Sequence, residues 1–301
     1  MTIFARRVSW WYRKHAIEST TGRWNENPDH GEHAMTSPAP YNTYGADLEK
    51  LLLLRTYPLA IKMLASESEV PDGAVRPKRD RGEHWAVCQV FSLARRQGET
   101  IAMFLEDHWC FEPIISYGLV ATPQDYLDGF TNAFFIADKE AAAEHAREMT
   151  RLPVGQYPGL VVGPLKTATY EPDLVMIYCT PAQLRHLLLS LRYLHGTQVT
   201  STLDPIGSCV HSVVPPLLTG ECAVTIPDPG DFERAGAGED EMVLTVPKGR
   251  LQELMEGVYH FEEIDRGFRR FNLSLHHDFK QPPFYEEYFR KWGLDGPPAS
   301  R

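Results

Sequence analysis

Three of the five cysteines in this chain stand where a thiol could do chemistry. Cys88 and Cys209 each open a helical segment that ends in Gly-Glu and leads into a strand, and Cys110 closes the polar loop Glu-Asp-His-Trp-Cys behind an apolar strand. A helix N-terminus stabilises a thiolate, and thiolates bind soft metals and iron–sulfur clusters. We therefore expect Cys88, Cys110 and Cys209 to hold one [4Fe–4S] cluster.

Three cysteine ligands on a four-iron cluster leave one iron open to a small organic substrate. An open metal centre polarises a substrate oxygen as a Lewis acid, which suits dehydration or reduction. Beside Cys110, Glu106, Asp107 and His108 are the candidate catalytic acid and base groups. Lys62 interrupts the apolar strand Pro-Leu-Ala-Ile-Lys-Met-Leu and is the candidate substrate-binding cation.

Each of these residues also has a purely structural interpretation. Free cysteine is among the most buried residue types and often packs as a small hydrophobic side chain. Cys179 and Cys222 lie within apolar strands, so we assign both to the core. Residues 106–108 could form a solvated turn, and Lys62 could point to solvent by simple strand alternation. The chain contains no GxGxxG, P-loop, GxSxG or HExxH motif, so nucleotide cofactors have no support.

The elements that must position these groups form an apparent internal repeat. Strand, proline and helix occur in sequence at 174–191 and again at 242–258, with matching apolar positions at helical spacing. Cysteine, helix, Gly-Glu and strand occur at 88–107 and again at 209–228. A duplication would place Cys88 and Cys209 at equivalent helix starts about a pseudo-twofold axis; chance similarity of short segments is the alternative.

Alternating strands and helices predict an α/β or α+β fold with a mixed sheet in a single large domain. We expect residues 45–262 to form this duplicated domain and residues 263–301, rich in aromatic side chains, to pack on it. Residues 1–44 read as a flexible extension, because the stretch from Ser19 to Pro40 is too polar to bury much surface. Met35 is an alternative natural start, so removal of residues 1–34 should leave the fold unchanged.

Composition narrows the class of protein. Hydrophobic residues make up 43% of the 301 residues and charged residues 23%, which is ordinary for a globular protein. The net charge of −10 argues against a nucleic-acid partner, which requires a basic face. No apolar run is long enough to span a membrane and no secretory signal opens the chain, so we expect a cytoplasmic protein with reduced thiols. The sequence does not decide whether the chain forms a homo-oligomer.

The motifs together resemble the domain of unknown function 169 family of bacteria and archaea. The resemblance rests on Cys88, Ala94-Arg95, Cys110, Cys209, Thr219-Gly220 and the stretch from Glu241 to Pro247, and it covers about Asp47 to Tyr259. It implies a shared fold and a shared set of cysteines, and it names no reaction or substrate.

The leading hypothesis from the sequence is an iron–sulfur enzyme, a lyase or an oxidoreductase, that acts on a small organic substrate. A non-enzymatic binding protein, serving as a sensor or carrier of a metal, cluster or small molecule, is the first alternative. The second is a thiol-based enzyme in which Cys110 is the nucleophile beside Asp107 and His108.

Overall fold

The structure is a computed structural model, and it describes residues 41–268 and 283–294. Residues 1–40 of the predicted extension, which include Met35, therefore lie outside the described residues. The last four residues of the extension, from Tyr41 on, belong to a helix rather than to a flexible segment. Residues 269–282 and 295–301 of the predicted C-terminal segment also lie outside the description.

One six-stranded sheet organises the domain, in the order β2-β3-β1-β4-β6-β5. Every pair of neighbouring strands is antiparallel, so the fold is the α+β form of the predicted class. The expectation of a mixed sheet is therefore wrong. The strands are β1 (Leu59–Leu64), β2 (Ile101–Phe104), β3 (Gly159–Pro164), β4 (Leu174–Cys179), β5 (Ala223–Thr225) and β6 (Met242–Pro247).

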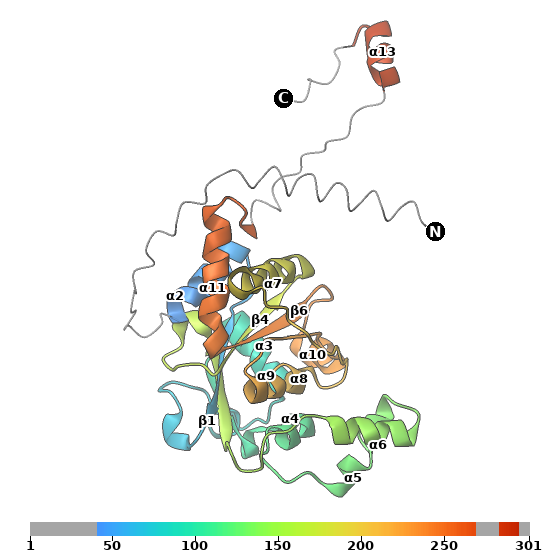
Figure 1. The fold of residues 1–301 in the computed structure, drawn as a ribbon. Helices are drawn as coiled ribbons and strands as arrows, with labels where there is room; N and C mark the ends of the chain where they lie inside the picture. Colours follow the sequence, from blue (N-terminus) through green and yellow to red (C-terminus); the bar gives the residue numbers. More distant parts are fainter. Residues whose placement is uncertain (1–40, 269–282, 295–301) are drawn as a thin grey trace. The chain divides into compact units, whose positions relative to one another are not determined.

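Helices pack against both faces of this sheet (Figure 1). The helices of the described residues are α2 (Tyr41–Leu52), α3 (Val87–Gln97), α4 (Phe111–Ser116), α5 (Gln124–Leu127), α6 (Lys139–Glu148), α7 (Pro181–His195), α8 (Ser208–His211), α9 (Val214–Thr219), α10 (Pro229–Ala235), α11 (Lys248–Glu263) and α13 (Pro283–Lys291). Short 3-10 turns η1, η3, η4 and η5 cover 67–69, 105–107, 132–134 and 165–167, and a π-turn η2 covers Pro77–Arg81.

Strand alternation divides the core into two layers. Leu59, Ile61, Met176 and their neighbours face α3, α8 and α9, whereas Ala60, Val175 and their neighbours face α2, α7 and α11. Phe268, from the start of the predicted C-terminal segment, is buried in the second layer. The three predicted ligand cysteines lie on the α3 side of the sheet.

Local sequence signals explain several of these elements. The predicted strand at Leu174–Cys179 is β4, which is buried along its whole length. The helix predicted after it is α7, where Thr180 and Gln183 form a capping box, Pro181 occupies the first turn and Gly196 ends the helix at φ 68°. Gly98 ends α3 in the same way at φ 80°.

Two expectations about elements near Cys209 need correction. The helix expected to run on from Cys209 is two short helices, because Pro215 and Pro216 lack the N–H groups that would continue α8. The sequence from Gln198 to Thr202 also predicts a short strand, but no strand forms there. A side chain of this segment contacts β5 instead, because the backbone N–H of Val224 in β5 donates a hydrogen bond to Ser201 Oγ at 2.7 Å.

The internal duplication stays a prediction. β2 and β5 lie at opposite edges of the sheet, and the central strands β1 and β4 are antiparallel. Helix α3, with Cys88, precedes β2, and the helices α8 and α9, with Cys209 in α8, precede β5. A pseudo-twofold axis between β1 and β4 would produce this order. That axis would relate β4 to β1 and β6 to β3. The two strand–proline–helix segments are β4 with α7 and β6 with α11, so the axis would not relate them to each other.

Candidate functional site

The first predicted ligand, Cys88, is the second residue of α3. The helix starts there because Gln89 accepts a hydrogen bond from the Ala86 N–H at 2.9 Å. Cys88 is 8% exposed, and its thiol faces the carbonyl oxygen of Gly230 in α10 at 4.0 Å. Cys88 thus sits where α3 and α10 pack together.

Cys110 is brought next to Cys88 by backbone pairing of two loops. The Trp85 N–H donates to the Asp107 carbonyl oxygen at 2.8 Å, and the Trp109 N–H donates back to the Trp85 carbonyl oxygen at 3.3 Å. Cys110 follows directly as the residue before α4, and it packs against the small cluster that contains Cys88. The two thiols therefore share one wall although their loops are distant in sequence.

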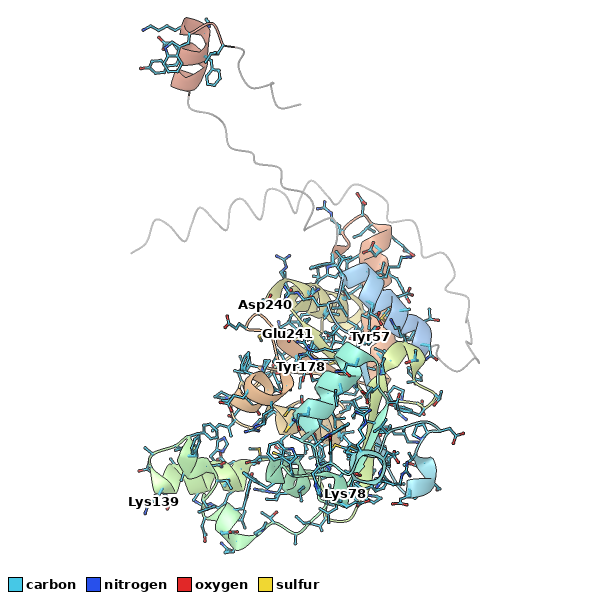
Figure 2. The ribbon with its side chains drawn as sticks, turned by 180° about the vertical axis from the view of Figure 1, so that it is seen from behind. Tyr57, Lys78, Lys139, Tyr178, Asp240 and Glu241 are labelled. Atoms are coloured by element: carbon cyan, nitrogen blue, oxygen red, sulfur yellow. The ribbon has the colours of Figure 1, made fainter. Side chains whose placement is uncertain are left out.

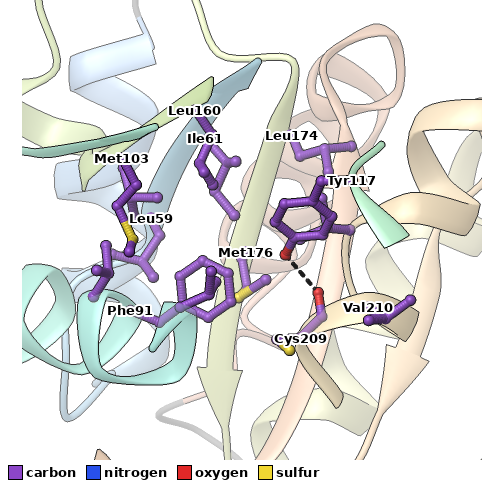
Figure 3. Close-up of a cluster of buried hydrophobic side chains, with 14 of the residues drawn as sticks. Leu59, Ile61, Phe91, Met103, Tyr117, Leu160, Leu174, Met176, Cys209 and Val210 are labelled. Carbon is purple, nitrogen blue, oxygen red and sulfur yellow. Dashed lines mark hydrogen bonds between the residues drawn. The ribbon is translucent and has the colours of Figure 1, made fainter. Parts of the chain in front are cut away.

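Cys209 is the second residue of α8, and Gly207, at φ 74°, turns the chain into that helix. The Tyr117 hydroxyl, fully buried, donates to the Cys209 carbonyl oxygen at 2.8 Å, as Figure 3 shows. The start of α8 is tied to α10 as well, because the Ser208 N–H donates to Asp228 at 2.9 Å. These bonds hold Cys209 on the side of the sheet that α3 covers.

All three cysteines line one cavity of about 210 Å³. Its wall combines the start of α3, the loop before α4, the residues that flank η4, the loop before α8 and helix α10. Trp109, Phe135 and Ile206 supply apolar surface, and Arg234, Glu112 and Asp228 supply charge. Residues from five segments of the chain thus converge on one small space, which is the arrangement of a binding site.

Burial controls the acidity of the three thiols. It raises the pKa of Cys88 to about 12, aided by the nearby carboxylates of Asp231 and Asp228. Burial also raises the pKa of Cys110 and, well above the ordinary value, that of Cys209. Without a bound cation the three side chains are therefore neutral thiols near pH 7. A metal centre would reverse this, since ligation deprotonates a thiol.

The three thiols are of the type that binds a soft metal, but they are not arranged around a position for a single metal ion. Three thiols around a confined cavity suit iron–sulfur chemistry. Among the described residues, no group of three or more His, Cys, Asp and Glu side chains is arranged to hold a metal ion. The cysteines share a cavity wall rather than surrounding a single point.

The predicted catalytic residues beside Cys110 do not line this cavity. Asp107 is fully buried and accepts hydrogen bonds from the N–H groups of Phe104 and Lys78 and from Arg76 Nε at 3.0 Å. Glu106 forms an ion pair with the same arginine at 2.5 Å. The contacts of Asp107 shape the loop that leads to Cys110, which is a structural role.

His108 is also buried, and neither ring nitrogen has a hydrogen-bond partner within the described part of the chain. Burial lowers its pKa to about 4, although the charge of Asp107 acts in the opposite direction. The imidazole is therefore neutral at pH 7. The catalytic role assigned to Glu106, Asp107 and His108 stays a prediction that their placement does not favour.

Lys62 and the two remaining cysteines lie elsewhere. Lys62, on β1, forms an ion pair with Glu69 at 3.6 Å and is not part of the cysteine cavity. Cys179 is buried in the second core layer, as predicted. Cys222 belongs to that layer too, but it also borders a second cavity of about 480 Å³, where His145 and His211 both approach Asp204.

Two charged residues of the cysteine cavity were missed by the sequence analysis. Glu112 lies two residues after Cys110, accepts a hydrogen bond from the Tyr126 hydroxyl at 2.7 Å and has a pKa raised by burial. Arg234 lies in α10 with its guanidinium over the ring of Trp109 at 5.2 Å. Glu112 is close to Cys110 in the sequence, which could have indicated it. Arg234 lies more than a hundred residues after Cys110, and no local sequence signal connects the two.

Comparisons with known proteins agree on one family. The model of the domain of unknown function 169 family, described as "Uncharacterised ArCR", matches residues 47–257. An uncharacterized protein of Methanocaldococcus jannaschii is 21% identical over 223 residues, which cover 72% of this chain and 93% of that protein. No solved structure matches. Across the described residues, no helix has both the length and the apolar character needed to cross a membrane.

Proposed function

The chain belongs to the domain of unknown function 169 family, and from its cavity we propose that it is an iron–sulfur enzyme. Cys88, Cys110 and Cys209 would hold a [4Fe–4S] cluster, and the enzyme would act on a small organic substrate by dehydration or reduction. The observation that carries the proposal is the convergence of these three cysteines on one cavity from separate elements. Such a cluster, when bound, supplies an open iron that polarises a substrate oxygen.

The surroundings of the cysteines support a cluster over a single ion. A cluster distributes its thiolate ligands over several irons, so its ligands lie farther apart than the ligands of one metal ion. Cysteines spread along a shared wall suit that requirement. Apolar side chains such as Trp109 and Phe135 form part of the cavity wall, and the hydrophobic surroundings of a cluster tune its potential.

The thiol-enzyme alternative receives less support. A nucleophilic cysteine works as a thiolate and needs a lowered pKa, usually from a neighbouring base or cation. Burial raises the pKa of Cys110, and His108, the expected base, is buried outside the cavity with a pKa near 4. A nucleophilic role for Cys110 would need a different activating group.

A non-enzymatic binding protein is the second candidate. The specific observation in its favour is that Glu106, Asp107 and His108 do not line the cavity, which removes the expected acid–base groups. Glu112 is the remaining candidate proton donor there, because burial raises its pKa and favours its protonated form. Glu112→Gln would abolish turnover but spare cluster binding in an enzyme.

The test is iron and acid-labile sulfide analysis of protein purified without oxygen. The parent should contain both, Cys110→Ala should lose them or bleach quickly in air, and Cys179→Ala should match the parent. Equal iron in Cys110→Ala and the parent would remove Cys110 from the site. Turnover with hydroxy acids would then separate an enzyme from a carrier, which should bind without converting them.

A further inference from the structure

The cysteine cavity has a single cationic side chain among the described residues that line it, Arg234. Arg234 is exposed at the mouth of the cavity, and its guanidinium lies over the indole ring of Trp109. Stacking on an aromatic face fixes the plane of the guanidinium and leaves its N–H edge available. No carboxylate in the described part of the chain lies within ion-pair distance of it.

The acidic residues of the same cavity are already engaged. Asp228 caps α10, and its oxygens accept from the N–H groups of Ser208 at 2.9 Å and Asp231 at 3.0 Å. Glu112 accepts a hydrogen bond from the Tyr126 hydroxyl at 2.7 Å. The cavity therefore offers one uncommitted cation, and its anions are occupied by internal hydrogen bonds.

We infer that the cavity selects small organic acids, whose carboxylate pairs with the guanidinium of Arg234 while the rest of the molecule reaches the three cysteines. A guanidinium matches a carboxylate with two parallel hydrogen bonds, which gives orientation as well as affinity. A cavity of about 210 Å³ limits the ligand to a small molecule. This inference rests on the proposed function and deepens it by naming the substrate class.

The guanidinium of Arg234 lies close to the glycine four residues earlier, at the start of α10. A Cβ at Gly230 would lie 2.8 Å from Arg234 Nη1 and 3.0 Å from Asp228 Oδ1. Helix α10 thus leaves space where the guanidinium passes the helix start toward the cavity.

The experiment compares two alkylating reagents on the full-length, metal-free protein at alkaline pH. The Cys110 thiol loses its proton to solvent base, its sulfur forms a bond to the CH₂ carbon, and iodide leaves with the C–I electron pair. Iodoacetate carries a carboxylate and iodoacetamide does not, so the ratio of their rates at Cys110 reports attraction of the anion. Peptide mass spectrometry assigns the modified cysteine.

Arg234→Gln should lower the iodoacetate-to-iodoacetamide rate ratio about tenfold, as expected for loss of a charge-assisted contact. Arg234→Lys should restore part of it, and Arg79→Gln, which removes an exposed arginine outside the cavity, should leave it unchanged. An equal ratio in Arg234→Gln and the parent would overturn the inference. So would a Cys110 that neither reagent modifies.

A competition arm identifies the anion. Lactate should protect Cys110 of the parent from iodoacetamide and should fail to protect it in Arg234→Gln; protection by inorganic phosphate but not by lactate would overturn the assignment to carboxylates. Because this assay needs no iron, it separates the two proposals. Absence of iron from the parent would refute the cluster alone, and an unchanged rate ratio would refute the role of Arg234 alone.

Discussion

Removing the carboxylate of Glu241 should destabilise the whole domain, because it would leave a buried arginine without its counter-ion. Arg95 donates to the two oxygens of Glu241 at 2.8 and 3.0 Å, and the two side chains are 1% and 6% exposed. The guanidinium of Arg95 also lies 3.9 Å from the centre of the Tyr178 ring. Both partners of this arginine, Tyr178 and Glu241, are labelled in Figure 2.

The size of the effect follows from that geometry. Breaking a buried ion pair by removing one partner costs about 3–5 kcal/mol, so Glu241→Ala should lower the melting temperature on the order of 10 °C. The neighbouring pair of Arg55 and Asp240 is also bidentate, but both side chains are more than half exposed. Asp240→Ala is thus a matched control and should change stability little.

Two further measurements test the reasoning. Replacing both partners, Arg95→Met with Glu241→Met, should recover much of the loss, because no charge is then left buried. The pKa of Glu241 is lowered: burial raises it, but hydrogen bonds from Arg95 and the Gly238 N–H outweigh burial. The contribution of Glu241 is therefore present above its unfolded pKa and is lost as pH falls through the folded pKa.

Thermal and urea unfolding of these variants at pH 7, with a pH series for Glu241→Ala and the parent, provides the assay. The difference between the two proteins should shrink below about pH 4. Melting of Glu241→Ala within a degree or two of the parent at pH 7, or an equal loss in Asp240→Ala, would refute the buried-charge argument. Because the pair joins α3 to the segment before β6, its loss should also loosen the helix that carries Cys88.

Three other predictions concern the site and its support. Cys179→Ala should cost about 1 kcal/mol or somewhat more in urea unfolding, through a small core cavity, and should leave iron content unchanged. Tyr117→Phe should cost about 1–3 kcal/mol, because the buried carbonyl of Cys209 loses its donor while the ring is retained; an unchanged urea midpoint would contradict this. Burial lowers the pKa of His108 to about 4, so the parent should lose stability between about pH 6.5 and pH 4, and His108→Leu should show a smaller loss on thermal unfolding over that window.

Local patterns predicted the elements well where one signal dominated. The apolar run at Leu174–Cys179 and the proline that follows it defined β4 and the start of α7, because strand burial and helix capping are decided within a few residues. The strand expected at Gln198–Thr202 does not form, because strand pairing depends on how residues far apart in the sequence are placed. The Ser201 side chain, rather than a backbone carbonyl of this segment, accepts the hydrogen bond from Val224 in β5. The order of the strands in the sheet could not be predicted from local patterns either, because it joins strands that lie far apart in the sequence.

The candidate site was predictable in part. The repeated cysteine–helix–Gly-Glu pattern indicated Cys88 and Cys209 as related positions, and the polar loop indicated Cys110; all three line one cavity. The roles suggested for Asp107 and His108 came from proximity in sequence, which cannot distinguish a cavity wall from a buried turn. Arg95 and Glu241 were noted only as motif residues, and 146 positions separate the partners of this pair.

The most direct test of the central claim is anaerobic reconstitution of the full-length chain with ferrous iron and sulfide, followed by metal analysis and a visible spectrum. The parent should bind about four irons per chain and turn brown. The triple variant with Cys88, Cys110 and Cys209 changed to alanine should stay colourless and bind little iron. A colourless parent, or equal iron in the triple variant, would contradict the assignment of a cluster to this cavity.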